Sequence, residues 1–146
     1  MIVSFSRRAV IAALAGLLVP LRASARGLFA PHAEAALRQF FIDRAFEMKR
    51  LAESMGDQGY GAVVVRGGGI VSESPSRVVV KKDATAHAER EALRDAQAKL
   101  GKDDLSDCVM YSTSRPCAAC ERAAAQAKLS RMYYGPQGAD AGVPSA

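Results

Sequence analysis

Residues Gly61 to Val71 read GAVVVRGGGIV, which is a β-branched apolar run, a triple glycine and a second apolar pair. This order predicts a β-hairpin whose turn contains residues with positive φ angles. The first run is apolar on both of its faces, which is typical of a central strand covered by helices on each side. The glycines precede a strand and lack the Walker lysine pattern, which argues against a phosphate-binding loop. We therefore expect the hairpin to lie within a sheet between two helical layers.

Helix and strand patterns alternate around this hairpin. Apolar residues recur at three- and four-residue steps from His32 to about Met55, which predicts an amphipathic helix that ends at Gly56 and Gly59. The later patterns predict, in order, a loop from Ser72 to Lys82 with a short extended piece at Val78–Val80, a helix from about Thr85 to Leu100, a strand at Cys108–Ser112, a helix from Cys117 to Lys128, and a strand at Arg131–Tyr134. The alternation predicts an α/β fold, a three-layer α/β/α sandwich.

The ends of these elements carry weaker signals. Asp83 or Thr85 is expected to cap the second helix at its start, and Gly101 to stop it. Residues 26–31 are expected to form a flexible lead-in. The segment from Gly135 onward, which is rich in Gly, Pro, Ala and Ser, is expected to be a mobile tail.

The amino terminus has the three-part layout of an export signal. Arg7 and Arg8 precede an apolar stretch from Ala9 to Leu21, which is too short to span a bilayer comfortably, and small residues follow it at 23–25. The arginine pair resembles a twin-arginine signal, which exports folded proteins. We expect cleavage after Ala25, which divides the chain into an export signal, residues 1–25, and one domain, residues 26–146. The alternative is an uncleaved helix that tethers the protein to a membrane or packs into the core.

Length and charge bound the function. The chain has 146 residues, 49% of them hydrophobic, which is enough for one globular domain. Cleavage would remove Arg7, Arg8 and Arg22, which lowers the 20 basic residues to 17 against 15 acidic ones and the net charge from +5 to +2. A near-neutral domain argues against a nucleic-acid partner, and no membrane span would remain. The expected location is periplasmic or exported.

Two short motifs carry the chemistry: a His-Ala-Glu sequence that contains His87 and Glu89, and a Pro-Cys-Ala-Ala-Cys sequence that contains Cys117 and Cys120. One imidazole and two thiolates are ligands for tetrahedral Zn²⁺ and leave one position open for water, which indicates a catalytic site. The order of the two motifs is the signature of zinc-dependent nucleobase deaminases. A lone Cys-x-x-Cys would be weak evidence, because redox motifs and zinc ribbons also contain it.

Spacing assigns the roles within these motifs. Cys117 and Cys120 lie one helical turn apart and can share one metal ion. Glu89 follows His87 by two residues and therefore lies on another helix face, so it is expected to carry protons rather than bind the metal. In the deamination expected of such a site, the metal lowers the pKa of a water molecule that attacks the amine-bearing carbon of the substrate ring. Glu89 passes protons to the ring nitrogen and to the departing ammonia.

The remaining histidine and cysteine have simpler interpretations. His32 has no acidic or thiol companion and is expected to be exposed, and Cys108 is expected to be a small core residue. An odd number of cysteines does not suit a disulfide framework. Zinc loading before folded export would protect the Cys-x-x-Cys pair from oxidation.

The stretch from Asp83 to Glu89 through Ser114 to Cys120 resembles the cytidine and deoxycytidylate deaminase superfamily, and the resemblance extends from Tyr60 to Tyr134. Within it, the chain is most similar to the guanine and nucleoside deaminase branch, and next to the tRNA adenosine deaminases. The resemblance implies a mixed five-stranded sheet between helices, one zinc ion per subunit and a homodimer.

This chain departs from that pattern at several positions. It has Ser76 where those branches have a substrate-contacting asparagine, Arg115 where they have glutamate, and Ala118-Ala119 between the cysteines where they have Pro-Met. It also stops soon after Tyr134, without the final strand and helix. We expect substrate contacts from Ser76, Ala88 and Arg115.

The sequence thus predicts a zinc-dependent hydrolase that releases ammonia from an amino-substituted nucleobase, nucleoside or related heterocycle, with a guanine or purine type favoured. Two alternatives stay open: a tRNA adenosine deaminase-like editing enzyme, and a non-catalytic zinc-binding protein on the same fold. Export argues against intact tRNA as substrate.

Overall fold

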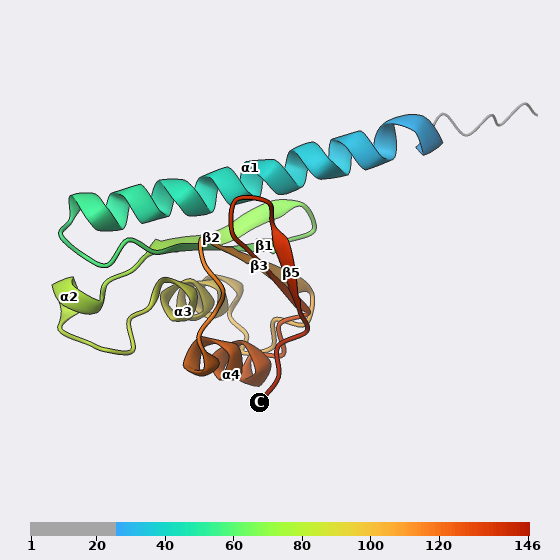
Figure 1. Cartoon of the computed structure of the whole chain (residues 1–146). Helices are drawn as coiled ribbons and strands as arrows, with labels where there is room; N and C mark the ends of the chain where they lie inside the picture. The colour runs from blue at the N-terminus through green and yellow to red at the C-terminus, as the bar shows by residue number, and fades with distance from the viewer. Residues whose placement is uncertain (1–25) are drawn as a thin grey trace, which may run out of the picture.

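The computed structural model describes residues 26–146 (Figure 1). The expected export signal, residues 1–25, lies outside the described residues. Between residues 26 and 146, no helix combines the length and the apolar character that crossing a membrane requires.

A mixed five-stranded sheet forms the middle layer, in the order β2-β1-β3-β4-β5. Its strands are β1 (Gly61–Arg66), β2 (Gly69–Pro75), β3 (Cys108–Ser112), β4 (Arg131–Tyr134) and β5 (Ala139–Gly142). Strands β3 and β4 pair in parallel and the other neighbours are antiparallel. The mixed α/β sheet is therefore confirmed.

The β1–β2 hairpin has the turn that its glycines predict. Gly67 and Gly68 have φ angles of 56° and 81°, and two consecutive residues with positive φ match the twist of the flanking strands. A register shift between Val64 and Val65 places a bulge next to this turn.

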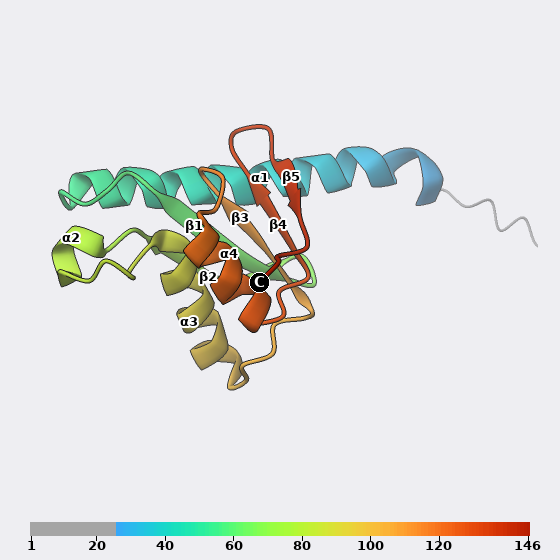
Figure 2. The same ribbon diagram turned by 60° about the horizontal axis from the view of Figure 1, so that its bottom comes forward.

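Helices cover both faces of the sheet, as the apolar pattern of β1 predicts. Helix α1 (Arg26–Ser54) lies along one face, and α3 (Ala88–Leu100) and α4 (Ala118–Gln126) lie on the other (Figures 1 and 2). Val63 and Val65 pack in a cluster with α1, whereas Ala62 and Val64 pack in a cluster with residues of α3 and α4. The three-layer arrangement is thus built on the two faces of β1.

At Gly61, helix α1 lies directly against the backbone of the sheet. A Cβ atom at this position would lie 2.1 Å from the carbonyl oxygen of Ala45, so only glycine fits where β1 begins.

Helix boundaries differ from the predicted ones. Helix α1 begins at Arg26, so residues 26–31 are helical and not a flexible lead-in. Helix α3 begins at Ala88 with His87 as its N-cap residue and no side-chain cap. Asp83 instead accepts the backbone N–H of Thr85 at 2.7 Å in the loop before the helix. Gly101, with φ 63°, ends α3 as predicted.

The valine run at 78–80 forms a single helical turn, α2 (Val78–Lys81), and not an extended piece. The carboxylate of Asp57 accepts the backbone N–H groups of Val79 and Val80, which supplies partners that the first turn of a helix lacks. Residues 72–75, expected in a loop, belong to β2.

The carboxyl-terminal segment is also more ordered than its composition predicts. Strand β5 pairs antiparallel with β4 after a turn in which Gly135 and Gly138 have φ angles of 74° and 61°. The expected mobile tail and the expected lack of a final strand are therefore both wrong. The residues of β5 have weak intrinsic strand propensity, and it is the backbone pairing with β4 that stabilises the strand.

Candidate metal centre

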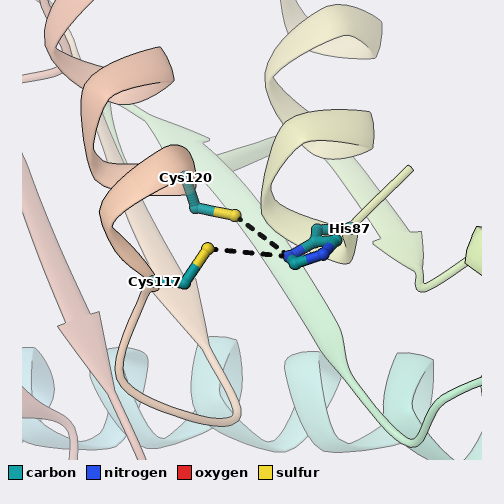
Figure 3. A group of neighbouring side chains, drawn as sticks. All are labelled: His87, Cys117 and Cys120. Carbon is teal, nitrogen blue, oxygen red and sulfur yellow. Dashed lines mark hydrogen bonds between the residues drawn. The ribbon is translucent and has the colours of Figure 1, made fainter. Parts of the chain in front are cut away.

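The three predicted ligands lie where two helices begin, side by side on one face of the sheet (Figure 3). His87 is the N-cap residue of α3, Cys117 is the N-cap residue of α4, and Cys120 lies within the first turn of α4. Each helix amino terminus carries a partial positive charge of roughly half a unit, which favours thiolate ligands beside it.

The two nitrogen–sulfur distances fit one tetrahedral metal ion. The Nδ1 atom of His87 lies 3.5 Å from Cys120 Sγ and 3.7 Å from Cys117 Sγ, and all three ligand atoms lie within 4.8 Å of one another. Bond lengths of about 2.0–2.3 Å to zinc at a tetrahedral angle require ligand separations of roughly 3.5–3.8 Å. Both cysteines are free thiols, so no disulfide competes for the sulfurs. The three side chains are therefore positioned to hold Zn²⁺.

The chemistry of the buried thiol also fits a cation. Cys120 is fully buried, and this burial together with the nearby Glu89 carboxylate raises the pKa of the Cys120 thiol. A thiolate at this place therefore needs a positive charge beside it, which a bound metal ion supplies.

Glu89 lies next to the ligands but outside the ligand group. Its side chain is 6% exposed, and Oε2 lies 3.7 Å from Cys120 Sγ. Burial raises the pKa of Glu89 above its ordinary value, although the His87 and Cys120 side chains act in the opposite direction. A carboxyl group whose pKa is raised in this way is a stronger base than an exposed one, which suits a group that accepts and releases a proton.

A cavity of about 310 Å³ opens beside the metal ligands. Its wall comes from three segments, the loop before β1, the start of α3 and the loop before α4, through Gln58, Tyr60, His87, Glu89, Ser114, Arg115 and Cys117. The sequence did not single out Gln58, Tyr60 or Ser114. Tyr60 is where the family resemblance begins, directly before Gly61 at the entry to the central strand, and this position could have pointed to it.

The loop between β3 and α4 is fixed to the start of β1. Gly61 and Thr113 exchange hydrogen bonds, from Gly61 N to Thr113 Oγ1 at 3.2 Å and from Thr113 N to Gly61 O at 3.0 Å. The Ser112 hydroxyl donates to the carbonyl of Ser114 at 2.8 Å. These bonds hold the backbone that leads to Cys117.

The three predicted substrate-contact residues occupy different places. Arg115 is exposed and lines the cavity. Ala88 is fully buried in the core under α3, and the structure places it off the cavity wall. Ser76 is also fully buried, and its hydroxyl donates to Asp57 Oδ1 at 2.9 Å, so it too lies off the wall.

The other expected assignments match their surroundings. Cys108 is fully buried in β3, and burial raises the pKa of its thiol to about 11, which suits an inert core residue. His32 is exposed on α1.

Residues 36–136 match the family model described as the cytidine and deoxycytidylate deaminase zinc-binding region. The chain is 35% identical over 102 residues to the guanine deaminase of Bacillus subtilis, an alignment that covers 69% of this chain and 65% of that protein. It is also 35% identical over 102 residues to the tRNA-specific adenosine deaminase of Agrobacterium fabrum, covering 70% of this chain and 67% of that protein. The X-ray structure of the Bacillus subtilis guanine deaminase is similar with a TM-score of 0.65 at 34% identity, over 66% of this chain and 62% of that one. The chain thus spans about two thirds of the length of these relatives.

Proposed function

Because this chain belongs to the cytidine and deoxycytidylate deaminase family, we propose that it is a zinc-dependent hydrolytic deaminase of a small amino-substituted heterocycle, with a purine base of the guanine type favoured. One observation carries this proposal. Three ligand atoms within 4.8 Å of one another and a buried carboxylate outside the ligand group lie together beside one cavity.

The residues divide the reaction between them. When bound, zinc supplies a Lewis acid that lowers the pKa of a water molecule in the cavity. Glu89 Oε2 accepts the proton of that water, and the oxygen adds to the ring carbon that carries the amine. Glu89 passes this first proton to the ring nitrogen, then accepts the hydroxyl proton of the adduct and passes it to the departing nitrogen, so that the carbon–nitrogen bond breaks and ammonia leaves. The carbon keeps the oxygen as a carbonyl group.

The size of the cavity supports a small substrate. A volume of about 310 Å³ lies at the lower end of the roughly 300–1,000 Å³ typical of ligand sites, which suits a single heterocycle. Residues 26–146 carry 17 basic and 15 acidic side chains, which gives little electrostatic attraction for a long polyanion. The tRNA-specific relatives make RNA the competing substrate, and the test below includes it.

The test measures ammonia release by the purified, zinc-loaded full chain. The panel contains guanine, adenine, cytosine, their nucleosides, pterins and a tRNA anticodon stem-loop. We expect turnover of a purine base. Turnover of the stem-loop alone would assign the protein to RNA editing, and full zinc content without any turnover would make it a zinc-binding protein only.

A matched pair of glutamate variants tests the proton carrier. Glu89→Gln should keep the zinc content of the wild type and lose ammonia release, because it removes the carboxylate but no ligand. Glu53→Gln changes an exposed glutamate of α1 that faces Lys49, and should keep both properties. Unchanged turnover in Glu89→Gln would refute the role of Glu89.

We also propose that residues 1–25 export the folded domain by a twin-arginine route and that the mature protein is a homodimer. Replacing both Arg7 and Arg8 with lysine should trap the precursor in the cytoplasm, and normal processing would point to the general secretion route instead. Sedimentation of the purified chain measures its oligomeric state.

A further inference from the structure

Part of the cavity wall belongs to the short loop between α1 and β1. Gln58 and Tyr60 line the cavity, yet Gln58 is exposed and Tyr60 is 45% exposed, so neither side chain is held by the core. The position of these two side chains therefore depends on how firmly the backbone of residues 58–60 is held.

Asp57 holds this backbone by four hydrogen bonds from two segments of the chain. Its Oδ1 atom accepts from the Ser76 hydroxyl at 2.9 Å and from the backbone N–H of Gln58 at 2.7 Å. Its Oδ2 atom accepts the backbone N–H groups of Val79 at 2.8 Å and Val80 at 2.9 Å. Both carboxylate oxygens are thus filled with donors, two from the valines of α2.

The segment that Asp57 binds leads directly to the metal centre. Ser76 N donates to the Tyr60 carbonyl at 3.0 Å, and Arg77 N donates to the carbonyl of Ala86, the residue before His87, at 2.9 Å. At the far end of α2, Lys81 pairs with Glu91, which lies on α3 two residues after Glu89. Helix α2 therefore connects the cavity loop to the start of α3.

We propose that Asp57 is a positioning residue, which fixes the wall formed by Gln58 and Tyr60 relative to the metal centre and thereby sets substrate affinity. Ser76 serves the same purpose through its hydrogen bond to Asp57, without touching the substrate. This inference rests on the proposed deaminase function, because it describes how that site binds its substrate.

The charge of Asp57 suits this role. Partial burial acts to raise the pKa of Asp57, but the hydrogen bonds from Val80, Ser76, Gln58 and Val79 outweigh it and hold the pKa below its ordinary value. The side chain is therefore a full carboxylate at neutral pH and can accept from all four donors.

The competing explanation is that Asp57 only stabilises the fold, as a cap of α2. Asp104 offers a matched control, because its carboxylate accepts the Ser106 N–H at 2.9 Å and the Lys128 ammonium at 3.0 Å. It lies beyond the carboxyl end of α3, roughly 20 Å from the metal centre along that helix.

The kinetic test compares Asp57→Ala, Asp57→Asn and Ser76→Ala with Asp104→Asn, using the substrate that the ammonia panel identifies. Asp57→Ala should raise KM by roughly tenfold to hundredfold, because it should let the wall formed by Gln58 and Tyr60 move by up to about 1 Å. The change in kcat should be smaller, and the zinc content should not change. Asp57→Asn should be intermediate, because an amide offers one acceptor oxygen in place of two. Ser76→Ala should raise KM less, and adding it to Asp57→Ala should change little, since both act through one contact. Asp104→Asn should keep the wild-type KM.

Amide hydrogen exchange gives a readout that does not depend on activity. Asp57→Ala should speed exchange both in residues 58–60 and at Val79 and Val80. An unchanged KM with an active wild type, or faster exchange confined to the two valines, would overturn the positioning role while leaving the proposed function intact. If the wild type deaminates nothing in the panel, the proposed function fails and the claim about substrate affinity fails with it.

Discussion

The two faces of the sheet are packed with different kinds of side chain. The cluster under α3 and α4 is alanine-rich and aliphatic: Ala62, Ala88, Ala92, Ala96, Ala124 and Ala127 are buried there beside larger residues such as Leu105, Met110 and Met132. Large side chains dominate the face under α1, with Phe41, Ile42, Tyr111 and Tyr133 in one cluster. The metal centre lies on the alanine-rich face.

The packing against α3 and α4 fixes the position of these two helices, whereas the packing against α1 mainly buries aromatic area. Alanine has no rotamer freedom, so a helix packed through alanines lies close to the sheet in one well-defined position. The Ser72 hydroxyl of β2 reaches the carbonyl of Ala92 on α3 at 2.6 Å, which shows how close this approach is. Two helices held in this way can bring ligand atoms within a few ångströms of one another.

The α1 face contributes mainly through aromatic area. Tyr111 and Tyr133 stack with ring centroids 5.0 Å apart, and Phe41 lies 5.4 Å from Tyr111. An aromatic side chain buries roughly 150–250 Å², so each ring of this cluster adds a large apolar area. Changes on the alanine-rich face should therefore affect the site, and changes on the aromatic face should affect stability.

The largest effect is expected at the metal centre. Cys117→Ser should remove nearly all bound zinc and lower the Tm, because metal binding is coupled to folding. Zinc per chain, measured after dialysis against a mild chelator, tests this. Cys108→Ala alters a buried cysteine outside the ligand group and should keep its zinc. Equal zinc content in both variants would mean that the ligand is misassigned.

On the aromatic face, Phe41→Ala should destabilise the protein by about 3–5 kcal/mol, because it leaves a cavity where a buried ring packs. Denaturant unfolding measures the loss. Below the unfolding transition, zinc content and kcat/KM should match the wild type. A large drop in kcat/KM of the folded variant would remove the proposed separation of the two faces.

On the opposite face, Ala92→Leu should cost about 1–3 kcal/mol through overpacking, less than the loss in Phe41→Ala. Its effect on kcat/KM should nevertheless be greater, because the larger side chain displaces α3 and with it His87 and Glu89. Ala98→Leu, at an exposed position of the same helix, is the control and should change neither property. Wild-type activity in Ala92→Leu would show that the site tolerates movement of α3.

The smallest effect is expected from Arg38→Gln. The Arg38 guanidinium lies 5.0 Å from the centre of the Tyr133 ring, and such a contact on the surface contributes about 0.5–1 kcal/mol. The midpoint of denaturant unfolding should shift slightly and the activity should not change. A loss as large as that of Phe41→Ala would mean that Arg38 holds the aromatic cluster together.

The elements that the sequence predicted correctly depend on local signals. The hairpin follows from β-branched residues around glycines, strand β3 from a short apolar run, and the end of α3 from Gly101 in a left-handed conformation. The metal ligands belong to the same class of signal, because the residue types and their spacing within one helical turn identify a zinc site before any fold is known.

The missed elements depend on contacts between distant segments. The valine run at 78–80 has high strand propensity, yet it is helical because Asp57 accepts two of its N–H groups. Strand β5 has weak propensity, yet it pairs with β4. The sequence of these two segments does not reveal that Asp57 would bind the first or that β4 would pair with the second.

The sequence by itself determined which side chains can bind zinc, and it predicted Glu89 as the proton carrier, because both inferences follow from residue types and their spacing. Only the tertiary structure decided which residues form the wall of the cavity and what Asp57 and Ser76 bind. The physical reason is that each backbone donor needs a partner, and in a folded chain that partner can come from a residue far away in sequence.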